Sequence, residues 1–353
     1  MDHRQAGGPL ITSRRGFFWV GAERAERPFG TVGHGAMFAG WEAPEQPRHP
    51  EPVILIHGGG GQGTDWLGTP DGRPGWATYL VQAGYVVYVV DRPGHGRASY
   101  HPDVLGPMAP PLSYQAAASL FSVPEGRRSQ EPAGDQASQW PGSGGAADPA
   151  LDQFMASGGP RLADTAAAHA LERARGAELL DRIGPAIVIS HSAGGPLGWL
   201  MADARPDLVT ALVAIEPLGP PFLDGGPGGF SLPWGLTAAP LTFDPPAASP
   251  AELALATVPG PPGAPPLRLQ ADPPRRLAVL ARVPIAVVSA EVSPLAGYAE
   301  AALAFLRQGG CQADLIRLAE HGVRGNGHGM IFERNNREVL DVVLRWLAAR
   351  RDD

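Results

Sequence analysis

The chain has 353 residues, of which 44% are hydrophobic, and this length suffices for one α/β domain with insertions and a large buried core. Its net charge of −7, without any cluster of arginines interleaved with aromatic residues, argues against a nucleic-acid partner. The single cysteine, Cys311, excludes an intramolecular disulfide and a thiolate metal site, and no apolar run reaches the length of a transmembrane helix, so no membrane partner is expected.

Residues 13–18 resemble a twin-arginine export signal, because two arginines stand shortly before two phenylalanines. The apolar segment that should follow such a signal is missing, since residues 19–20 lead straight into a charged stretch. A first β-strand over residues 16–20, followed by a second over residues 35–41, explains the same residues better. We therefore expect a cytoplasmic protein.

A buried strand over Val53–Ile56 ends in a run of glycines at residues 58–63. Gly58, Gly60 and Gly63 satisfy the dinucleotide-binding pattern, with Asp91 after a later strand as the acid that would bind a ribose. That pattern requires a helix directly after the third glycine, and we expect a loop over residues 66–75 instead. The alternative is a glycine loop whose backbone amides, at Gly59 and Gly60, stabilise an oxyanion, and we favour it.

Residues 99–160 form a long proline-rich excursion, which we expect to be a cap or lid. Its candidates for the walls of a substrate pocket are Trp140 and Phe154, although packing onto the body of the protein explains them equally well. Asp164 then predicts the N-cap of a helix that ends at Ile183, before a glycine and a proline.

The segment 186–196 is the centre of the sequence argument. Four apolar residues at 186–189 predict a strand buried on both faces, and apolar residues at helical spacing follow from Leu197. Between them, small residues two positions before and after Ser192 allow a sharp strand-to-helix turn. Such a turn raises the Ser192 hydroxyl above the sheet edge and places the amide of Ala193 beside it. We interpret this turn as a nucleophile elbow.

Strands are predicted over residues 208–215, 284–289 and 313–318, and helices over residues 296–308 and 335–350. A second excursion at residues 218–274 interrupts this alternation, and we expect it to be a second cap or lid segment, with Trp234 as a further candidate for substrate contact. The alternation of strands and helices predicts an α/β fold, with a mostly parallel central sheet covered by helices on both faces.

Acyl transfer through a serine also needs a base and an acid that orients the base. We favour His328 as the base over His321, because small neighbours let its imidazole reach across the cleft. His191 should point away from the cleft, and His57 should support the glycine loop through hydrogen bonds. For the acid, both Glu216 and Glu291 end strands at the correct edge, and the residues alone do not decide between them.

These motifs together resemble the α/β-hydrolase superfamily, and more narrowly bacterial carboxylesterases with a Ser-His-Glu triad. The resemblance covers most of the chain from residue 16 and is carried by the stretches 57–59, 190–195, 215–217 and 325–336, with 139–142 and 152–154 in the first excursion. It implies that Glu216 is the triad acid and that the amides near Gly59 and of Ala193 form the oxyanion hole. Contacts that side chains make at residues 59 and 60 in relatives cannot be carried over, because both are glycine here.

The sequence thus predicts a serine carboxylic-ester hydrolase that acts on a small or medium-sized ester through an acyl-enzyme, without a metal or cofactor. A homodimer is compatible with this prediction. Three alternatives stay open: a lactonase, amidase or acyltransferase on the same fold; a nicotinamide-dependent oxidoreductase that uses residues 58–63; and a non-catalytic binding protein on a hydrolase scaffold.

Overall fold

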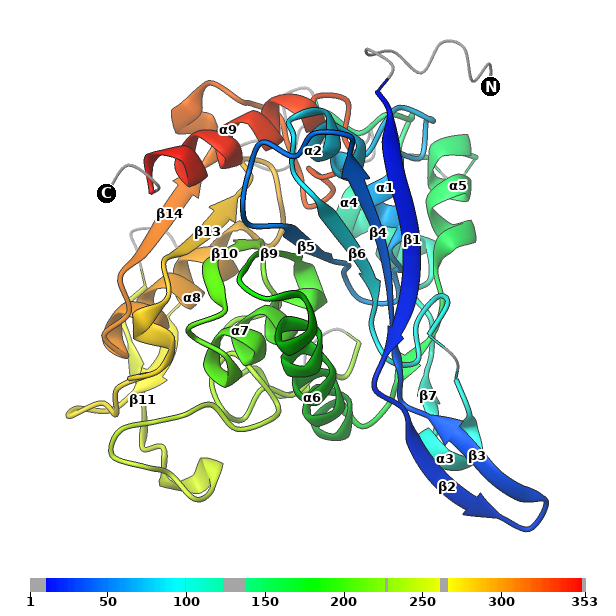
Figure 1. Ribbon diagram of the computed structural model, residues 1–353. Helices are drawn as coiled ribbons and strands as arrows, with labels where there is room; N and C mark the ends of the chain where they lie inside the picture. Colours follow the sequence, from blue (N-terminus) through cyan, green and yellow to red (C-terminus); the bar gives the residue numbers. More distant parts are fainter. Residues whose placement is uncertain are drawn as a thin grey trace.

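The computed structural model describes residues 11–98, 100–122, 138–145, 147–225, 228–260 and 266–350. Among these residues the central sheet has eight strands in the order β1-β4-β6-β5-β9-β10-β13-β14 (Figure 1). The six strands from β6 to β14 run parallel, whereas β4 is antiparallel to both of its neighbours, β1 and β6. The strands are β1 (Ser13–Val20), β4 (Met37–Pro44), β5 (Val53–Ile56), β6 (Val87–Asp91), β9 (Ala186–His191), β10 (Val209–Ile215), β13 (Ile285–Ser289) and β14 (Ala313–Arg317).

Helices cover both faces of this sheet, which confirms the predicted fold class. Alternate residues of a strand point to opposite faces, and in β5 Ile54 and Ile56 enter one core cluster while Val53 and Leu55 enter the other. The first face is packed by α6 (Thr165–Ile183), α7 (Gly195–Ala204) and α8 (Ala296–Gln308), and the second by α2 (Trp76–Gln82) and α9 (Asn336–Ala349). A strand that is buried on both faces must consist of apolar residues throughout, and all four residues of β5 are apolar.

The predicted boundaries of α6 agree with the structure. Asp164 is the N-cap, and its side chain accepts a hydrogen bond from the Ala167 amide at 2.9 Å. The helix ends at Ile183, and its C-cap Gly184 has a φ of +82°, which an L side chain rarely adopts. The structure also confirms that residues 13–20 belong to a strand, since β1 pairs with β4 along its whole length.

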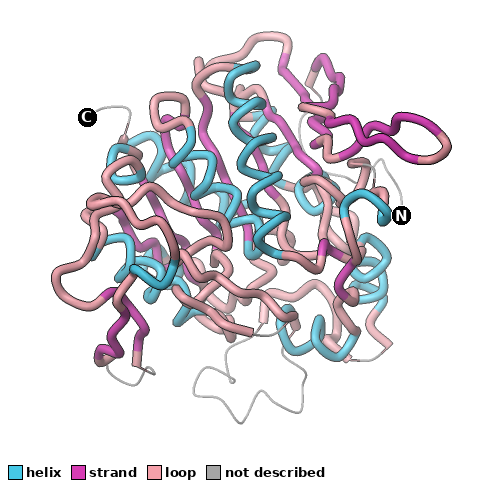
Figure 2. The backbone as a smooth tube through the Cα atoms, turned by 90° about the horizontal axis from the view of Figure 1, so that it is seen from below, coloured by secondary structure: helices cyan, strands magenta, loops and turns pink. Residues whose placement is uncertain are grey.

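Two local features were not predicted from the sequence. The polar connection between β1 and β4 forms a hairpin of β2 (Glu23–Arg27) and β3 (Gly30–His34), which projects from the body (Figures 1 and 2). Its strands are too polar to show a buried face, so hydrophobic alternation could not reveal them. The expected loop after Gly63 instead starts with one helical turn, α1 (Thr64–Leu67), which ends at Gly68.

The two excursions add short elements beside the carboxyl edge of the sheet. The first contains α3 (Pro102–Leu105), β7 (Met108–Ala109), α4 (Tyr114–Phe121) and α5 (Pro149–Ser157), and β8 (Arg161–Leu162) follows it. The second contains the hairpin of β11 (Leu255–Val258) and β12 (Leu267–Gln270). Most of its large apolar side chains, Phe222 and Trp234 among them, are buried in the first core cluster. Among the described residues, no helix has the length and apolarity needed to span a membrane.

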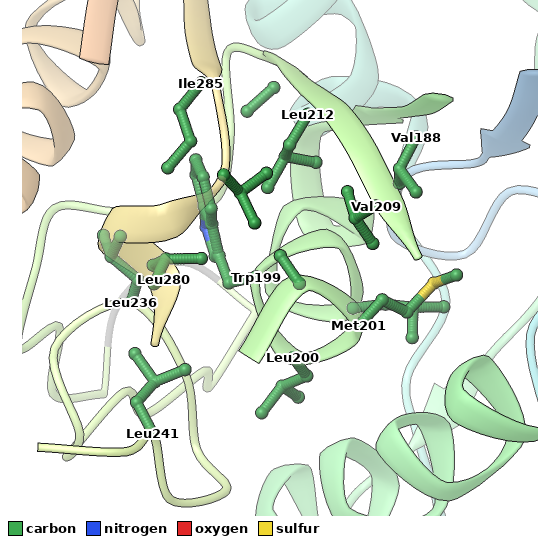
Figure 3. Close-up of a cluster of buried hydrophobic side chains, with 14 of the residues drawn as sticks. Val188, Trp199, Leu200, Met201, Val209, Leu212, Leu236, Leu241, Leu280 and Ile285 are labelled. Carbon is green, nitrogen blue, oxygen red and sulfur yellow. The ribbon is translucent and has the colours of Figure 1, made fainter. Parts of the chain in front are cut away.

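The packing of the core predicts that two tryptophans contribute very different amounts to the free energy of unfolding. Trp199 of α7 is fully buried (Figure 3), whereas 49% of Trp19 on the edge strand β1 is exposed. Trp199→Ala should therefore lower the free energy of unfolding by about 3–5 kcal/mol through lost burial and a cavity. The matched change Trp19→Ala should cost less than about 1 kcal/mol. Urea unfolding followed by circular dichroism measures both, and equal losses would contradict this packing.

Candidate active site

Ser192 lies in the sharp turn between β9 and α7. Its φ of +53° is in the left-handed region, which a residue with a side chain occupies only when its surroundings impose it. The neighbouring glycines show why small residues are needed here. A Cβ on Gly194 would lie 2.3 Å from the His57 carbonyl oxygen, and one on Gly195 would lie 2.7 Å from the Pro217 Cβ. The strand ends are packed too closely for larger side chains, so this sequence folds into a tight elbow.

The elbow serine is joined to a histidine and a glutamate that are far away in the sequence. His328 Nε2 lies 2.9 Å from Ser192 Oγ, and His328 Nδ1 lies 2.8 Å from Glu216 Oε2. Because a carboxylate can only accept, His328 carries its proton on Nδ1, and its Nε2 is free to accept the serine proton. The side chains of His328 and Glu216 are both fully buried.

The carboxylate of Glu216 is held by three donors. Besides His328, the amide of Ala290 donates to Oε1 at 3.0 Å, and the Ser293 hydroxyl donates to Oε2 at 2.5 Å. Glu216 follows β10 directly, and its φ of +36° is again in the left-handed region. Strained backbone at both Ser192 and Glu216 is typical of functional sites, where the surrounding structure compensates the strain.

Glu291, the other candidate acid, contacts a different loop. Its carboxylate pairs with Arg324 at 2.8 Å and accepts a hydrogen bond from the Gly325 amide at 3.2 Å. The carboxylate that contacts His328 is therefore that of Glu216. The loop after β13, which carries Glu291, contributes donors to Glu216 through Ala290 and Ser293.

The glycine loop lies against the elbow. A Cβ on Gly58 would lie 3.2 Å from the Ser192 Cβ, and a Cβ on Gly59 would lie 3.2 Å from the Ala193 Cβ. Gly60 has a φ of +64°, and its carbonyl accepts a hydrogen bond from the Gly159 amide at 2.7 Å. In the described part of the chain, the Gly59 amide has no hydrogen-bond acceptor. The loop and the elbow thus bring Gly59 and Ala193 together beside the serine.

The features that suggested a dinucleotide site serve the loop itself. The Asp91 carboxylate is fully buried and accepts hydrogen bonds from the Gly63 amide at 2.6 Å and from Arg97 Nε at 2.7 Å. Asp91 is therefore occupied within the protein. In addition, α1 offers only a single turn after Gly63, whereas a dinucleotide site uses the N-terminus of a longer helix.

His57 and His191 lie where the sequence analysis predicted. His57 supports the glycine loop, with Nδ1 2.9 Å from the Gly58 carbonyl oxygen. His191 lies behind His328, to whose carbonyl its Nε2 donates at 2.9 Å, and burial together with nearby His328 lowers the pKa of His191 to about 3. His321 is exposed.

The three aromatic residues predicted to contact substrate have different surroundings. Phe154 lines a cavity of about 220 Å³ together with Gly59, Gly60, Leu112 and Met155. The prediction for Trp140 is not supported, because Trp140 is buried and donates from Nε1 to Asp148 at 2.7 Å. The same holds for Trp234, whose indole stacks on Phe243 within the core. Both rings pack in the interior instead of lining a substrate pocket, as large aromatic residues commonly do.

The sequence of residues 51–280 matches the model of a family described as "alpha/beta hydrolase fold". The chain belongs to this family. It is 37% identical over 348 residues to the probable secreted lipase phiG of Fungal sp. (strain ATCC 74256), which covers 98% of this chain and 91% of the relative.

Among solved structures, a novel bacterial esterase superposes with a TM-score of 0.67 and 22% identity, and the match covers 98% of both chains. This likeness supports the fold. The protein is thus a hydrolase of the α/β-hydrolase fold, and its 37%-identical relative is named as a probable lipase.

Two charged residues of the site were missed in the sequence. Arg92 follows β6 and Glu333 follows an apolar run at residues 330–332, and both are buried. A charged residue at the end of a buried strand or beside an apolar run is the signal that could have identified them. Among the described residues, no group of three or more histidine, cysteine, aspartate or glutamate side chains is arranged to hold a metal ion.

Glu333 fastens the loop that carries His328. Its carboxyl group accepts hydrogen bonds from Asn326 Nδ2 at 2.8 Å and from the Gly327 amide at 2.9 Å. Burial raises the pKa of Glu333 to about 8, and the nearby Glu216 charge adds to this effect against the two hydrogen bonds. The folded protein therefore keeps the Glu333 proton up to a higher pH than the unfolded chain does.

This raised pKa predicts how stability depends on pH. Between about pH 4.5 and pH 8 the unfolded chain releases the Glu333 proton and the folded protein keeps it, so rising pH favours unfolding by ~1.4 kcal/mol per pH unit. Glu333→Gln, which mimics the protonated group, should show a shallower loss of stability between about pH 5 and pH 7.5, measured by urea unfolding. Glu338→Gln, at an exposed position on α9, is the control and should keep the wild-type profile. A wild-type slope in Glu333→Gln would contradict the assignment.

Proposed function

We propose that this hydrolase cleaves carboxylic esters through an acyl-enzyme intermediate. The observation that carries the proposal is the continuous chain of hydrogen-bonding atoms from Ser192 Oγ through His328 to Glu216, with separations of 2.9 and 2.8 Å. His328 takes the proton of Ser192 as the oxygen attacks the ester carbonyl, and then gives it to the leaving alcohol. Water, deprotonated by His328, then releases the carboxylic acid. Glu216 holds the imidazole and stabilises its charged form.

The amides of Gly59 and Ala193 are the proposed oxyanion donors. They stand on the two segments that meet beside Ser192. Backbone amides aimed at a developing oxyanion stabilise the transition state more than they stabilise the bound substrate, and this difference lowers the barrier. Gly60, the third predicted member, has its carbonyl tied to Gly159, and we assign it to the shape of the loop.

The cavity beside Gly59 supports a small or medium-sized ester with an apolar group. Its walls are mostly apolar and come from the first excursion, with Leu112, Phe154 and Met155 among them. We propose that this excursion acts as a cap over the site. The second excursion approaches the site at Phe230, whose ring would lie 3.7 Å from a Cβ on Gly59.

An ester is favoured over a lactone or an amide because the 37%-identical relative bears the name of a lipase. An acyltransferase would use the same residues and differ only in the acceptor, an alcohol in place of water. That relative is also named as secreted, so it favours export over the cytoplasmic localisation expected from the sequence. Localisation and a homodimer stay predictions, and residues 1–10 lie outside the described part of the chain.

The decisive test replaces the nucleophile. Ser192→Ala should reduce hydrolysis of p-nitrophenyl esters on the order of a millionfold, because the triad acts as a unit. It should also abolish labelling by a fluorophosphonate, while circular dichroism and the melting temperature stay close to those of the wild type. Hydrolysis within about tenfold of the wild type would overturn the proposal.

A second test compares the two candidate acids. Glu216→Gln should lower kcat by about ten-thousandfold, because an amide holds the imidazole in the wrong tautomer. The matched variant Glu291→Gln should lower kcat by at most about tenfold, since Glu291 pairs with Arg324. Steady-state kinetics at the pH optimum of each enzyme measure both effects. The reverse order would show that Glu291 orients the histidine in solution.

A further inference from the structure

A buried ion pair lies beneath the glycine loop. Arg92 directly follows β6, and only 4% of it is exposed. Its Nη1 lies 3.0 Å from Oε1 of Glu172, a buried residue of α6. An arginine stays charged even when buried, so the pair must be compensated by further hydrogen bonds. The other hydrogen bonds of the Arg92 guanidinium therefore indicate its role in the structure.

The guanidinium holds the two backbone segments that border the serine. Its Nη2 donates to the Gly58 carbonyl at 2.7 Å, and its Nη1 donates to the Ala193 carbonyl at 3.2 Å. Within the described residues, Arg92 Nε and Glu172 Oε2 have no hydrogen-bond partner. A guanidinium that served only its carboxylate would bind it through two parallel hydrogen bonds. Here one contact goes to the carboxylate and two go to carbonyls.

His57 adds to the same arrangement. The Arg92 amide donates to His57 Nε2 at 3.1 Å, so the proton of the imidazole is on Nδ1, which donates to the Gly58 carbonyl at 2.9 Å. The Gly58 carbonyl oxygen thus accepts one hydrogen bond from Arg92 and one from His57. Both donors are buried, so water does not compete for this oxygen.

A carbonyl that is held in this way also fixes the next amide. The atoms of a peptide bond lie in one plane, and in a trans peptide the C=O of one residue and the N–H of the next point in opposite directions. The Gly58–Gly59 bond is trans, so two donors on the Gly58 oxygen keep the Gly59 N–H directed to the other side. The amide of Ala193 is fixed likewise, because the Ser192 carbonyl accepts from the Leu218 amide at 2.8 Å.

We propose that Arg92 is a positioning residue of the oxyanion hole. Through the Gly58 and Ala193 carbonyls it holds the glycine loop at a fixed distance and angle from the elbow, so that the Gly59 amide stays aimed at the oxygen that becomes charged. Arg92 does not touch the substrate, and Glu172 keeps its guanidinium in place. The inference rests on the ester hydrolysis proposed above.

The test removes both charges together. Arg92→Met alone would leave Glu172 buried and unpaired, whereas replacing a buried ion pair by apolar side chains of similar volume often leaves stability unchanged. The double variant R92M/E172M should lower kcat by about 10- to 1000-fold and change KM less than about threefold. The upper limit is the loss of kcat that follows the removal of one oxyanion donor. The affinity of the double variant for an aryl boronic acid, which forms a tetrahedral adduct with the serine, should fall by the same factor as kcat/KM.

Arg175 provides a control. It is also a buried arginine and lies on α6, where it pairs with Glu23 and Glu178 and donates to the Gly35 carbonyl at 2.8 Å, so these partners belong neither to the glycine loop nor to the elbow. Arg175→Met should lower the melting temperature and leave kcat and boronate affinity within about threefold of the wild type. If R92M/E172M shows this same pattern, Arg92 has only a structural role and the proposal is wrong.

Two further variants keep the outcomes separate. If R92M/E172M does not fold, Arg92→Lys keeps the charge beside Glu172 but offers one ammonium group instead of a planar fork, and kcat should fall at least about tenfold. A wild-type kcat in Arg92→Lys would overturn the proposal. Ser192→Ala distinguishes this failure from that of the proposed function, because an inactive Ser192→Ala with a fully active Arg92→Lys refutes only the role of Arg92.

Discussion

A buried carboxylate must be compensated, and this constraint organises the site. Glu216 is fully buried, and a charge without water around it costs several kcal/mol unless hydrogen bonds replace the solvent. The structure supplies an imidazole from the loop after β14, and an amide and a hydroxyl from the loop after β13. Three segments that are far apart in the sequence are thereby held at one point. The orientation of His328 toward Ser192 follows from this arrangement.

Close packing at the carboxyl edge of the sheet explains the composition of the loops. The elbow, the glycine loop and the turn after β10 approach one another so closely that a Cβ at Gly194 or Gly195 would collide with its neighbour. Glycine is required there for space, because both residues have ordinary right-handed backbone that any residue can adopt. The same crowding forces left-handed backbone on Ser192 and Glu216, which carry side chains. Strain and glycine content thus have one cause, namely the convergence of parallel strand ends.

The site also depends on a second layer of buried polar groups that never reach the cleft. Arg92 and Glu172 lie beneath the glycine loop, and Glu333 lies beneath the histidine loop. Arg92 and Glu333 bind backbone groups of segments that carry a proposed catalytic group, and Glu172 pairs with Arg92. Loops are the most adaptable parts of a fold, and such fastening keeps them at the distances that proton transfer requires. Ion pairs of this kind add little stability by themselves. We therefore explain the buried pair of Arg92 and Glu172 by the backbone segments that Arg92 holds in place.

The sequence by itself determined the elements and the candidates. Hydrophobic periodicity and the residues that form turns and caps are local properties of the sequence. We could therefore predict β5, the bounds of α6 and the elbow at Ser192 from residues that are close together in the chain. The family resemblance implied that Glu216 is the triad acid. Where the residues by themselves left Glu216 and Glu291 open, the tertiary structure places Glu216 on His328 and Glu291 on Arg324 of another loop. It also buried Trp140 and Trp234 in the interior. The physical reason is that hydrophobicity states only that an aromatic ring will be covered, and packing over long sequence distances determines what covers it.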